Sequence, residues 1–167
     1  FAVRGGRAYF PLACGVVKCI SLKDGSEIWS RQFDGKIYST PAISGKTLVF
    51  GCTDGNVYAL NASDGSVKWK YHTEKSVLAS PAIMDGLVYI GGSDHKFRAL
   101  SLKDGSAVWT YSPVEGHAIS TPYCDGERVV FGTWGRTLYS LDPRTGREQW
   151  KWTVKKPSRM YSPAHCV

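Results

Sequence analysis

The sequence predicts an all-β protein: a β-propeller segment of about four blades, each built from four antiparallel strands. Three observations predict it. Tryptophan, proline and glycine recur every 40 or 41 residues, each unit divides into short apolar runs, and glycine-containing pairs separate those runs. A unit of this length that holds four strands is typical of a propeller blade.

Three residue types carry the period in one register. The tryptophans are Trp29, Trp69, Trp109 and Trp150, and the turn glycines are Gly25, Gly65, Gly105 and Gly146. The prolines are Pro41, Pro81, Pro122 and Pro163. We therefore expect one propeller domain over 1–167, with blades at about 1–36, 37–76, 77–117 and 118–158 and the first strand of a further blade at 159–167.

The strands of one blade are clearest in the second unit. Its apolar runs predict strands at about Tyr38–Ile43, Thr47–Cys52, Val57–Asn61 and Val67–Tyr71. Pairs such as Asp54-Gly55 and Asp64-Gly65 lie between the runs, and such pairs favour hairpin turns because glycine tolerates a positive φ. No segment shows a long apolar period of 3.6 residues, so no helix is expected.

A lone blade cannot bury both faces of its sheet, so neighbouring blades must stack. One tryptophan in the fourth strand of each unit is large and flat enough to fill the contact between two blades. The sequence therefore predicts that the four tryptophans are buried at equivalent places, with the four turn glycines beside them as structural residues.

Composition narrows the class of protein. The 167 residues are 43% hydrophobic and 21% charged, with a formal net charge of +7, which argues against disorder. No apolar run reaches the ~18 residues of a transmembrane helix, so no transmembrane segment is expected. Residues 126–160 hold eight basic and three acidic side chains. Basic runs there do not exceed two residues and no RNA-stacking motif accompanies them, so we expect a protein partner and no nucleic acid.

Cysteine and histidine give no recognisable catalytic or metal motif. The five cysteines lack C-x-x-C spacing, which excludes the common zinc and haem-attachment motifs. The histidines fall at different repeat positions, so the repeat does not gather them: His72, His95, His117 and His165. His95 replaces a turn glycine and is expected to face solvent. The hydroxyls before the prolines, Thr40, Ser80, Thr121 and Ser162, are interpreted as ties between innermost strands, with a polar ring for a ligand or water as the alternative.

The units resemble the pyrroloquinoline-quinone-like (PQQ-like) β-propeller repeat. The resemblance rests on VYALNASDGSVKWKY, FRALSLKDGSAVWTY, LYSLDPRTGREQWKW and the degenerate VKCISLKDGSEIWSR, and on the element Thr40-Pro41-Ala42 with its counterparts. It covers essentially the whole chain. The WD40 repeat fits less well because its G-H and W-D signatures are missing. In kind, the chain is closest to non-enzymatic bacterial propellers such as the lipoprotein of the outer-membrane β-barrel assembly machinery.

The resemblance implies two classes of function. Quinoprotein dehydrogenases of the family hold PQQ and Ca²⁺ and often carry an adjacent Cys-Cys pair, which this sequence lacks. Most aspartates here stand at turns, and only Asp34 and Asp94 are less committed. We therefore expect no catalytic residue, cofactor or metal, and interpret the chain as a non-catalytic scaffold or protein-interaction module. The expected location is the periplasm or another extracytoplasmic compartment, and the free cysteines leave the cytoplasm as the alternative. The alternatives are a fragment of a PQQ-dependent dehydrogenase and a propeller attached to a separate catalytic domain.

Blade number leads to one further expectation. Propellers of this family usually have seven or eight blades, so four blades form half a ring and leave two apolar faces exposed. We expect that the parent protein has about four more blades, or that two chains self-associate to complete the ring. A closed ring of four blades is the third and less favoured option.

Overall fold

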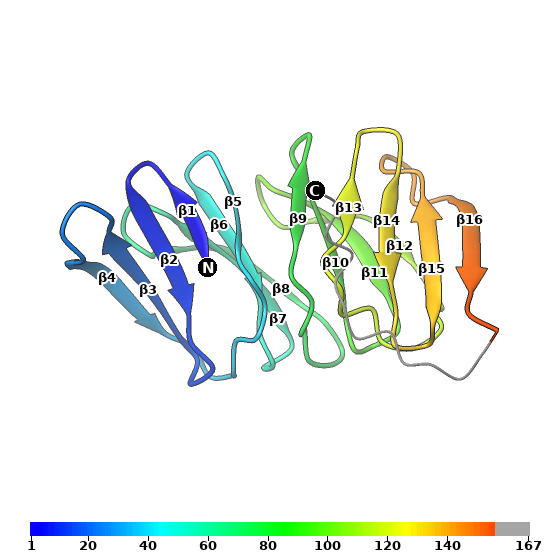
Figure 1. The fold of residues 1–167 in the computed structure, drawn as a ribbon, viewed down its shortest axis with the longest axis horizontal. Coiled ribbons are helices and arrows are strands. Elements are labelled where there is room, and N and C mark those ends of the chain that lie inside the picture. Colours follow the sequence, from blue (N-terminus) through cyan, green and yellow to red (C-terminus); the bar gives the residue numbers. More distant parts are fainter. Residues whose placement is uncertain (156–167) are drawn as a thin grey trace.

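The computed structural model describes residues 1–155, and within them it contains sixteen β-strands and no helix (Figure 1). The strands form four sheets, each with four strands paired antiparallel in sequence order. The first sheet holds β1 (Ala2–Arg4), β2 (Arg7–Pro11), β3 (Val16–Ser21) and β4 (Glu27–Gln32). The second holds β5 (Ala42–Ser44), β6 (Thr47–Gly51), β7 (Asn56–Asn61) and β8 (Val67–His72). The third holds β9 (Ala82–Met84), β10 (Leu87–Gly91), β11 (Phe97–Ser101) and β12 (Ala107–Tyr111). The fourth holds β13 (Tyr123–Cys124), β14 (Val129–Gly132), β15 (Thr137–Leu141) and β16 (Glu148–Thr153).

These sheets confirm the predicted all-β class and its blade-like units of four strands. In the described part of the chain, no helix is long and apolar enough to cross a membrane. The further strand expected at 159–167 lies outside the described residues.

The same tight turn joins the third and fourth strands of every sheet. In the second sheet, Asp64 Oδ1 accepts a hydrogen bond from the backbone N–H of Ser66 at 2.8 Å, and Gly65 follows with a φ of 73°. A left-handed φ costs most L-residues about 1–2 kcal/mol, whereas glycine adopts it freely. The aspartate therefore stabilises the turn and the glycine supplies its backbone conformation, as the sequence predicts.

A β-bulge recurs just after this turn in all four sheets. The register between third and fourth strands shifts at Cys19/Ile20, Ala59/Leu60, Ala99/Leu100 and Ser140/Leu141. A bulge bends a strand, increases its twist and changes the direction of nearby side chains. Because it lies beside each repeat tryptophan, the bulge is part of the local structure that turns the indole towards the next sheet.

The first strand of each blade is shorter than predicted. In the second sheet it begins at Ala42, whereas the sequence predicts a start at Tyr38. Ser39 accounts for the difference, because its hydroxyl accepts from the Gly51 N–H and donates to the Gly51 carbonyl, both at 3.0 Å. The Ser39 hydroxyl therefore bonds the N–H and the carbonyl of Gly51, which the backbone of a longer first strand would otherwise pair with.

Successive sheets pack in chain order along the molecule, and their first strands are neighbours (Figure 1). Three buried apolar clusters fill the three contacts between sheets, which we call seams. The first seam joins Tyr9 and Trp29 to Phe50 and Leu60, and its members are almost completely buried. Each sheet is therefore stabilised by its neighbours, as a stacked repeat requires.

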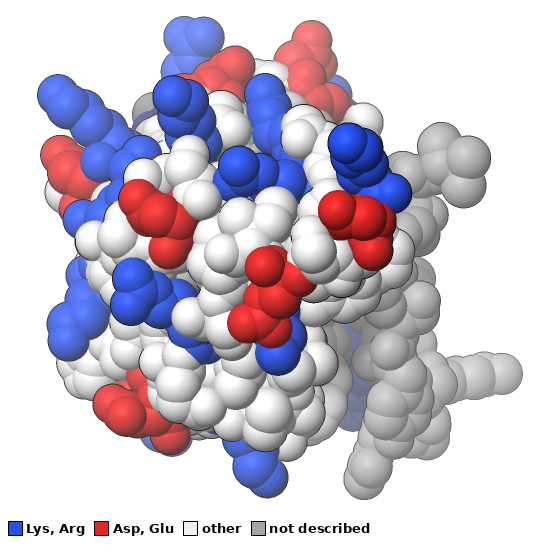
Figure 2. Space-filling view, turned by 90° about the vertical axis from the view of Figure 1, so that its left-hand side faces the viewer, with Lys and Arg blue, Asp and Glu red and all other residues white. Residues whose placement is uncertain are grey.

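Within residues 1–155, the first and fourth sheets each keep one face on which no other sheet packs. On the first sheet, residues alternate so that Val3 points away from the first seam and is exposed, while Phe1 stacks on Phe10 with ring centroids 5.1 Å apart. On the fourth sheet, Trp150 and Trp152 lie on the face away from the third seam and are exposed. Figure 2 shows the side of the first sheet, where basic and acidic side chains are interspersed around uncharged surface.

Candidate functional site

The tryptophans and turn glycines singled out by the sequence meet across the three seams. Trp69 Nε1 donates a hydrogen bond to the carbonyl of Leu102 in the next sheet at 3.0 Å. Trp29 and Trp109 make the equivalent bonds at 3.1 and 2.9 Å. The indole of Trp69 also covers Gly105, where an added Cβ would lie 2.6 Å from the ring atom Cε3. Each seam therefore combines an apolar contact with a directional hydrogen bond.

Trp150 differs from the expectation that all four tryptophans are buried. Its side chain is 43% exposed, whereas Trp29 and Trp69 are buried and Trp109 is half-buried. The reason is positional, because in residues 1–155 no sheet packs on the outer face of β16. Gly25 shows the complementary situation at the other end, since no atom lies within 4 Å of the place where its Cβ would be.

The third and fourth sheets depart from the repeat at one end, because another residue replaces the glycine of a turn there. The turn between the second and third strands has a positive φ at Gly15 and Gly55, as glycine permits. At the equivalent positions the third and fourth sheets carry His95 and Arg136, with φ of 61° and 64°. A non-glycine residue held at a positive φ is uncommon, although histidine is among the residues enriched there. Features shared by every blade serve packing, so these departures mark the candidate functional site.

Two histidines meet at this break. His95 lies in the turn between β10 and β11, and His117 lies in the connection from β12 to β13 that crosses it. Their ring centroids are 4.9 Å apart, and both side chains are half-buried. The exposed indole of Trp134 packs edge-on against His117, with centroids 6.2 Å apart. The site thus gathers two imidazoles and one indole.

Backbone carbonyls orient both imidazole rings. His95 Nδ1 lies 3.3 Å from the carbonyl oxygen of Val114, and His117 Nδ1 lies 3.0 Å from that of Ser93. A carbonyl oxygen only accepts, so each Nδ1 must carry the hydrogen. In the neutral ring the lone pair is then on Nε2. His95 is half-buried rather than simply facing solvent, because a backbone carbonyl holds its ring beside a second imidazole at an interplanar angle of 37°.

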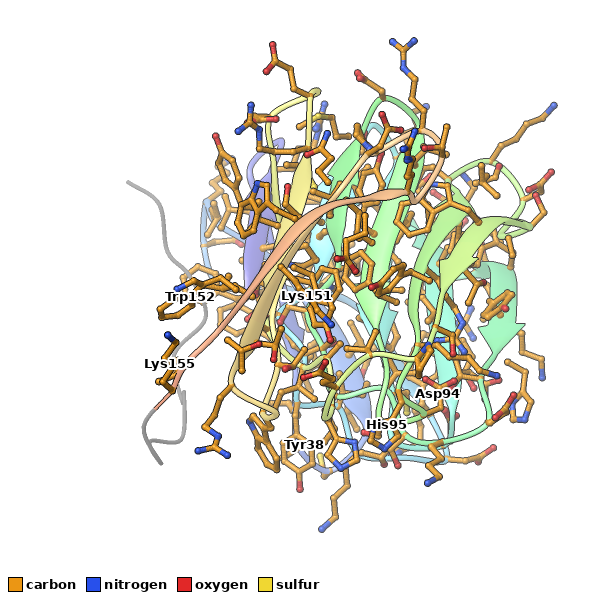
Figure 3. All side chains as sticks on the ribbon, turned by 90° about the vertical axis from the view of Figure 1, so that its right-hand side faces the viewer. Tyr38, Asp94, His95, Lys151, Trp152 and Lys155 are labelled. Atoms are coloured by element: carbon orange, nitrogen blue, oxygen red, sulfur yellow. The ribbon has the colours of Figure 1, made fainter. Side chains whose placement is uncertain are left out.

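A buried ion pair flanks His95 in the same turn. Asp94 and Arg98 are joined by hydrogen bonds, and both side chains are almost completely buried. Burial alone would raise the pKa of Asp94, but the hydrogen bonds and charge of Arg98 lower it overall. Arg98 also lies over the ring of Tyr71, 5.8 Å from its centroid. The sequence assigned no role to Asp94. In the structure it stabilises the turn that contains His95 (Figure 3).

The remaining aspartates do not gather into a metal-binding group in the described residues. Four of them bond to backbone N–H groups within the turns that follow the third strands: Asp24, Asp64, Asp104 and Asp142. Within residues 1–155, no group of three or more His, Cys, Asp or Glu side chains is placed to hold a metal ion. A calcium site needs several oxygen ligands that converge, so this donor set does not fit the Ca²⁺ that accompanies PQQ.

Other residues singled out by the sequence lie elsewhere. His72 contacts Asn56 Oδ1 through Nδ1 at 3.1 Å, and His165 lies outside the described residues. The hydroxyl of Ser80 accepts a hydrogen bond from the Thr40 N–H at 2.8 Å, which agrees with a tie between innermost segments. In the basic segment, Lys151 pairs with Glu115 at 3.2 Å on the side of the fourth sheet (Figure 3).

Comparison with known proteins places these observations in a family. A family model described as "Outer membrane protein assembly factor BamB" matches residues 13–162. The chain belongs to this PQQ-like propeller family. Among curated protein sequences there is no significant match.

Solved structures with this fold include a BamB protein and two dehydrogenases. BamB from Moraxella catarrhalis superposes with a TM-score of 0.79 at 25% identity, covering 92% of this chain and 47% of that protein. A europium-containing methanol dehydrogenase superposes with a TM-score of 0.78 at 14% identity, covering 90% and 40%. The quinohemoprotein alcohol dehydrogenase from Comamonas testosteroni gives 0.78 at 18% identity, covering 89% and 33%. The chain thus spans less than half the length of these proteins, and the two dehydrogenases share only its fold.

Sequence reasoning missed the histidine pair because it compared the histidines by repeat position. His95 and His117 come from different segments of the unit, and they meet only because the connection after β12 crosses the turn after β10. The useful signal is replacement of the turn glycine by His95 and Arg136 in two consecutive units.

Proposed function

We propose that this chain is a non-catalytic propeller module that binds a protein partner outside the cytoplasm. The family model for an outer-membrane protein assembly factor supports both the type of function and the location. The observation that carries the proposal is a pair of exposed aromatic side chains at the end of the propeller where the repeat breaks. Trp134 is 53% exposed and Tyr38 is 57% exposed.

Rigid strands position this surface. Tyr38 lies in the connection from β4 to β5, whose Lys36 N–H donates to Thr53 Oγ1 at 2.7 Å. Trp134 lies in the turn after β14, and its N–H donates to the His117 carbonyl at 3.1 Å. Figure 3 places Tyr38 and His95 towards the same end of the molecule. Tryptophan and tyrosine are enriched among the residues that contribute most to protein interfaces, so this end is the proposed partner surface.

Site-specific photo-crosslinking in the parent protein, in its own cells, tests the proposal. A benzophenone amino acid replaces Trp134 or Tyr38, and the control replaces Val67, which is also 53% exposed but lies beside the turn at the other end of the second sheet. We expect one discrete protein adduct from positions 134 and 38 and none from 67. Equal adducts at all three positions, or none at 134 and 38, would contradict the proposed surface.

Two further measurements address location and catalysis. We expect osmotic shock to release the protein with the periplasmic fraction or to leave it membrane-associated, and recovery with cytosolic markers would contradict the location. We also expect titration with PQQ and Ca²⁺ to give no saturable binding and no dye reduction with alcohols. Saturable binding with turnover would favour the dehydrogenase alternative.

The two outer faces support one more proposal about assembly. We propose that the exposed faces of the first and fourth sheets pack against further blades of the same kind, supplied by the parent protein or by a second chain. Light scattering on the 167-residue chain tests this, because open apolar faces predict dimers or larger species. A stable 18.4 kDa monomer without aggregation would contradict the proposal.

A further inference from the structure

We propose that His95 and His117 form a binding site for one divalent transition-metal ion of the imidazole-preferring class, such as Zn²⁺ or Cu²⁺. The inference does not depend on the proposed partner surface. It rests on the orientation of the two rings, their separation and the unusual backbone that holds one of them.

The orientation of the rings leaves the metal-binding atoms available. Both Nδ1 atoms donate to backbone carbonyls, at 3.3 Å for His95 and 3.0 Å for His117. Metal-bound histidines usually donate their other ring N–H to a carbonyl or carboxylate, which fixes the tautomer and raises the basicity of the ligating nitrogen. Here that arrangement exists for two neighbouring rings, and in the neutral tautomer it places the lone pair of each ring on Nε2.

The separation of the rings also suits chelation. With Zn–N bonds of about 2.0–2.1 Å and a tetrahedral angle, two ligating imidazoles have centroids about 5 Å apart. The observed centroid distance is 4.9 Å, with an angle of 37° between the ring planes. Both side chains are half-buried, so solvent reaches part of each side chain and could supply the water ligands that complete the coordination shell.

The backbone is consistent with selection for the His95 side chain. His95 has a φ of 61°, at a position where the first two sheets use glycine. Such strain persists where the surroundings enforce it, and it tends to gather at functional sites. The buried Asp94–Arg98 pair flanks His95, and Asp94 Oδ1 also accepts a hydrogen bond from the Lys96 N–H at 3.3 Å.

Among residues 1–155 the pair has no third ligating side chain beside it, so we expect micromolar rather than structural-site affinity. Among divalent ions, imidazole ligands suit zinc, copper and nickel, and affinity should follow Mn²⁺ < Co²⁺ < Ni²⁺ < Cu²⁺ > Zn²⁺. Binding would tie the turn between β10 and β11 to the connection after β12, and would therefore raise the melting temperature in proportion to the logarithm of metal concentration above the Kd.

Calorimetry and electron paramagnetic resonance with Cu²⁺, and calorimetry with Zn²⁺, test the site at pH 7.5. The background carries Cys14→Ser, His165→Asn and Cys166→Ser, which removes an exposed thiol and two candidate ligands of the C-terminal segment. The test variants are His95→Asn and His117→Asn. Asparagine places an N–H donor where Nδ1 was, lacks an Nε2 ligand, and is among the residues that tolerate a positive φ. Each variant should therefore fold.

The control is His72→Asn, because His72 also has its Nδ1 against an oxygen but no second imidazole in ring contact among the described residues. We expect one ion per chain, a Cu²⁺ spectrum with two nitrogen ligands, and at least a tenfold loss of affinity in either test variant but not in the control. Absence of saturable binding, or an equal loss in His72→Asn, would overturn the proposal. Binding that survives His95→Asn and His117→Asn would overturn it as well.

Discussion

A methyl group added at Gly105 should destabilise the protein more than the same methyl group added at Gly25. Both glycines occupy the same place in the turn before a fourth strand, with φ of 76° and 74°. An added Cβ at Gly105 would lie 2.6 Å from Cε3 of Trp69, whereas nothing lies within 4 Å of the equivalent atom at Gly25. The two substitutions therefore share the backbone strain and differ in the contact with the neighbouring blade.

The expected difference follows from these two effects. Moving an alanine into the left-handed region costs about 1–2 kcal/mol, and this applies to both Gly25→Ala and Gly105→Ala. Forcing a methyl group into a filled contact costs a further ~1–3 kcal/mol, and this applies to Gly105→Ala alone. We therefore expect the free energy of unfolding to fall by about 1–2 kcal/mol for Gly25→Ala and by about 2–5 kcal/mol for Gly105→Ala.

Urea denaturation of both variants measures these changes, provided that the slope with denaturant stays constant. A double-mutant cycle with Trp69→Ala isolates the contact, because Gly105→Ala in that background should cost no more than Gly25→Ala. Equal destabilisation by the two alanine variants in the wild-type background would refute the seam argument. So would additive effects of Trp69→Ala and Gly105→Ala.

Three other predictions concern titration, thiol reactivity and the exposed indole. Burial raises the pKa of Tyr89 to about 12, so the folded state holds this proton more tightly than the unfolded state. Stability should therefore fall as pH rises from about 10 towards the folded value, and urea midpoints should show a shallower fall in Tyr89→Phe. Exposed Cys14 should be alkylated by iodoacetamide in the native protein. Cys52 should react only after unfolding, because it is buried and burial raises its pKa to about 11. Mass spectrometry of the native and denatured protein after alkylation measures both reactions. Finally, Trp150→Ala should cost about 1 kcal/mol or less in this chain but about 3–5 kcal/mol where a following blade covers the indole; an equal cost in the parent protein and this chain would argue against such a blade.

The blades were predictable because local and long-range signals agree. Each turn glycine is marked by an aspartate or a similar turn residue, and each tryptophan stands at a fixed distance beyond it. The hydrogen bond from Trp69 to the Leu102 carbonyl could not be read from composition, but the 40-residue period already placed the two residues in adjacent blades. Repetition therefore converts local sequence into long-range contacts.

The start of the first strand was not predictable in the same way. The predicted strand begins at Tyr38 and continues to Ile43, with Ser39, Thr40 and Pro41 inside it. The hydroxyl of Ser39, however, occupies both backbone groups of Gly51, so backbone pairing begins only at Ala42. A side chain that replaces a backbone partner leaves the hydrophobic pattern unchanged, and for that reason sequence periodicity cannot detect it.

The histidine pair and the end faces were hidden for opposite reasons. His95 and His117 break the repeat, so an argument built on repeat positions separates residues that the folded chain brings within ring contact. Trp150 lies at the expected repeat position, so the same argument predicts that it is buried. It is exposed, because its burial requires a sheet packed on the outer face of β16. Sequence symmetry predicts what each blade contributes to a seam, but not whether the partner for that contribution is present.

The two outer faces carry complementary halves of one contact. At the three occupied seams, an indole N–H bonds to a carbonyl in the following blade and the ring covers the turn glycine of that blade. Trp150 presents the indole half on the fourth sheet, and the open turn at Gly25 presents the glycine half on the first sheet. A contact that joins unlike surfaces head to tail generates a ring when the rotation between units closes, and an open array when it does not. Further blades of this kind would therefore add at either outer face through the same contact that forms the occupied seams. The site around His95 and His117 lies at the loop end of the blades and would remain accessible.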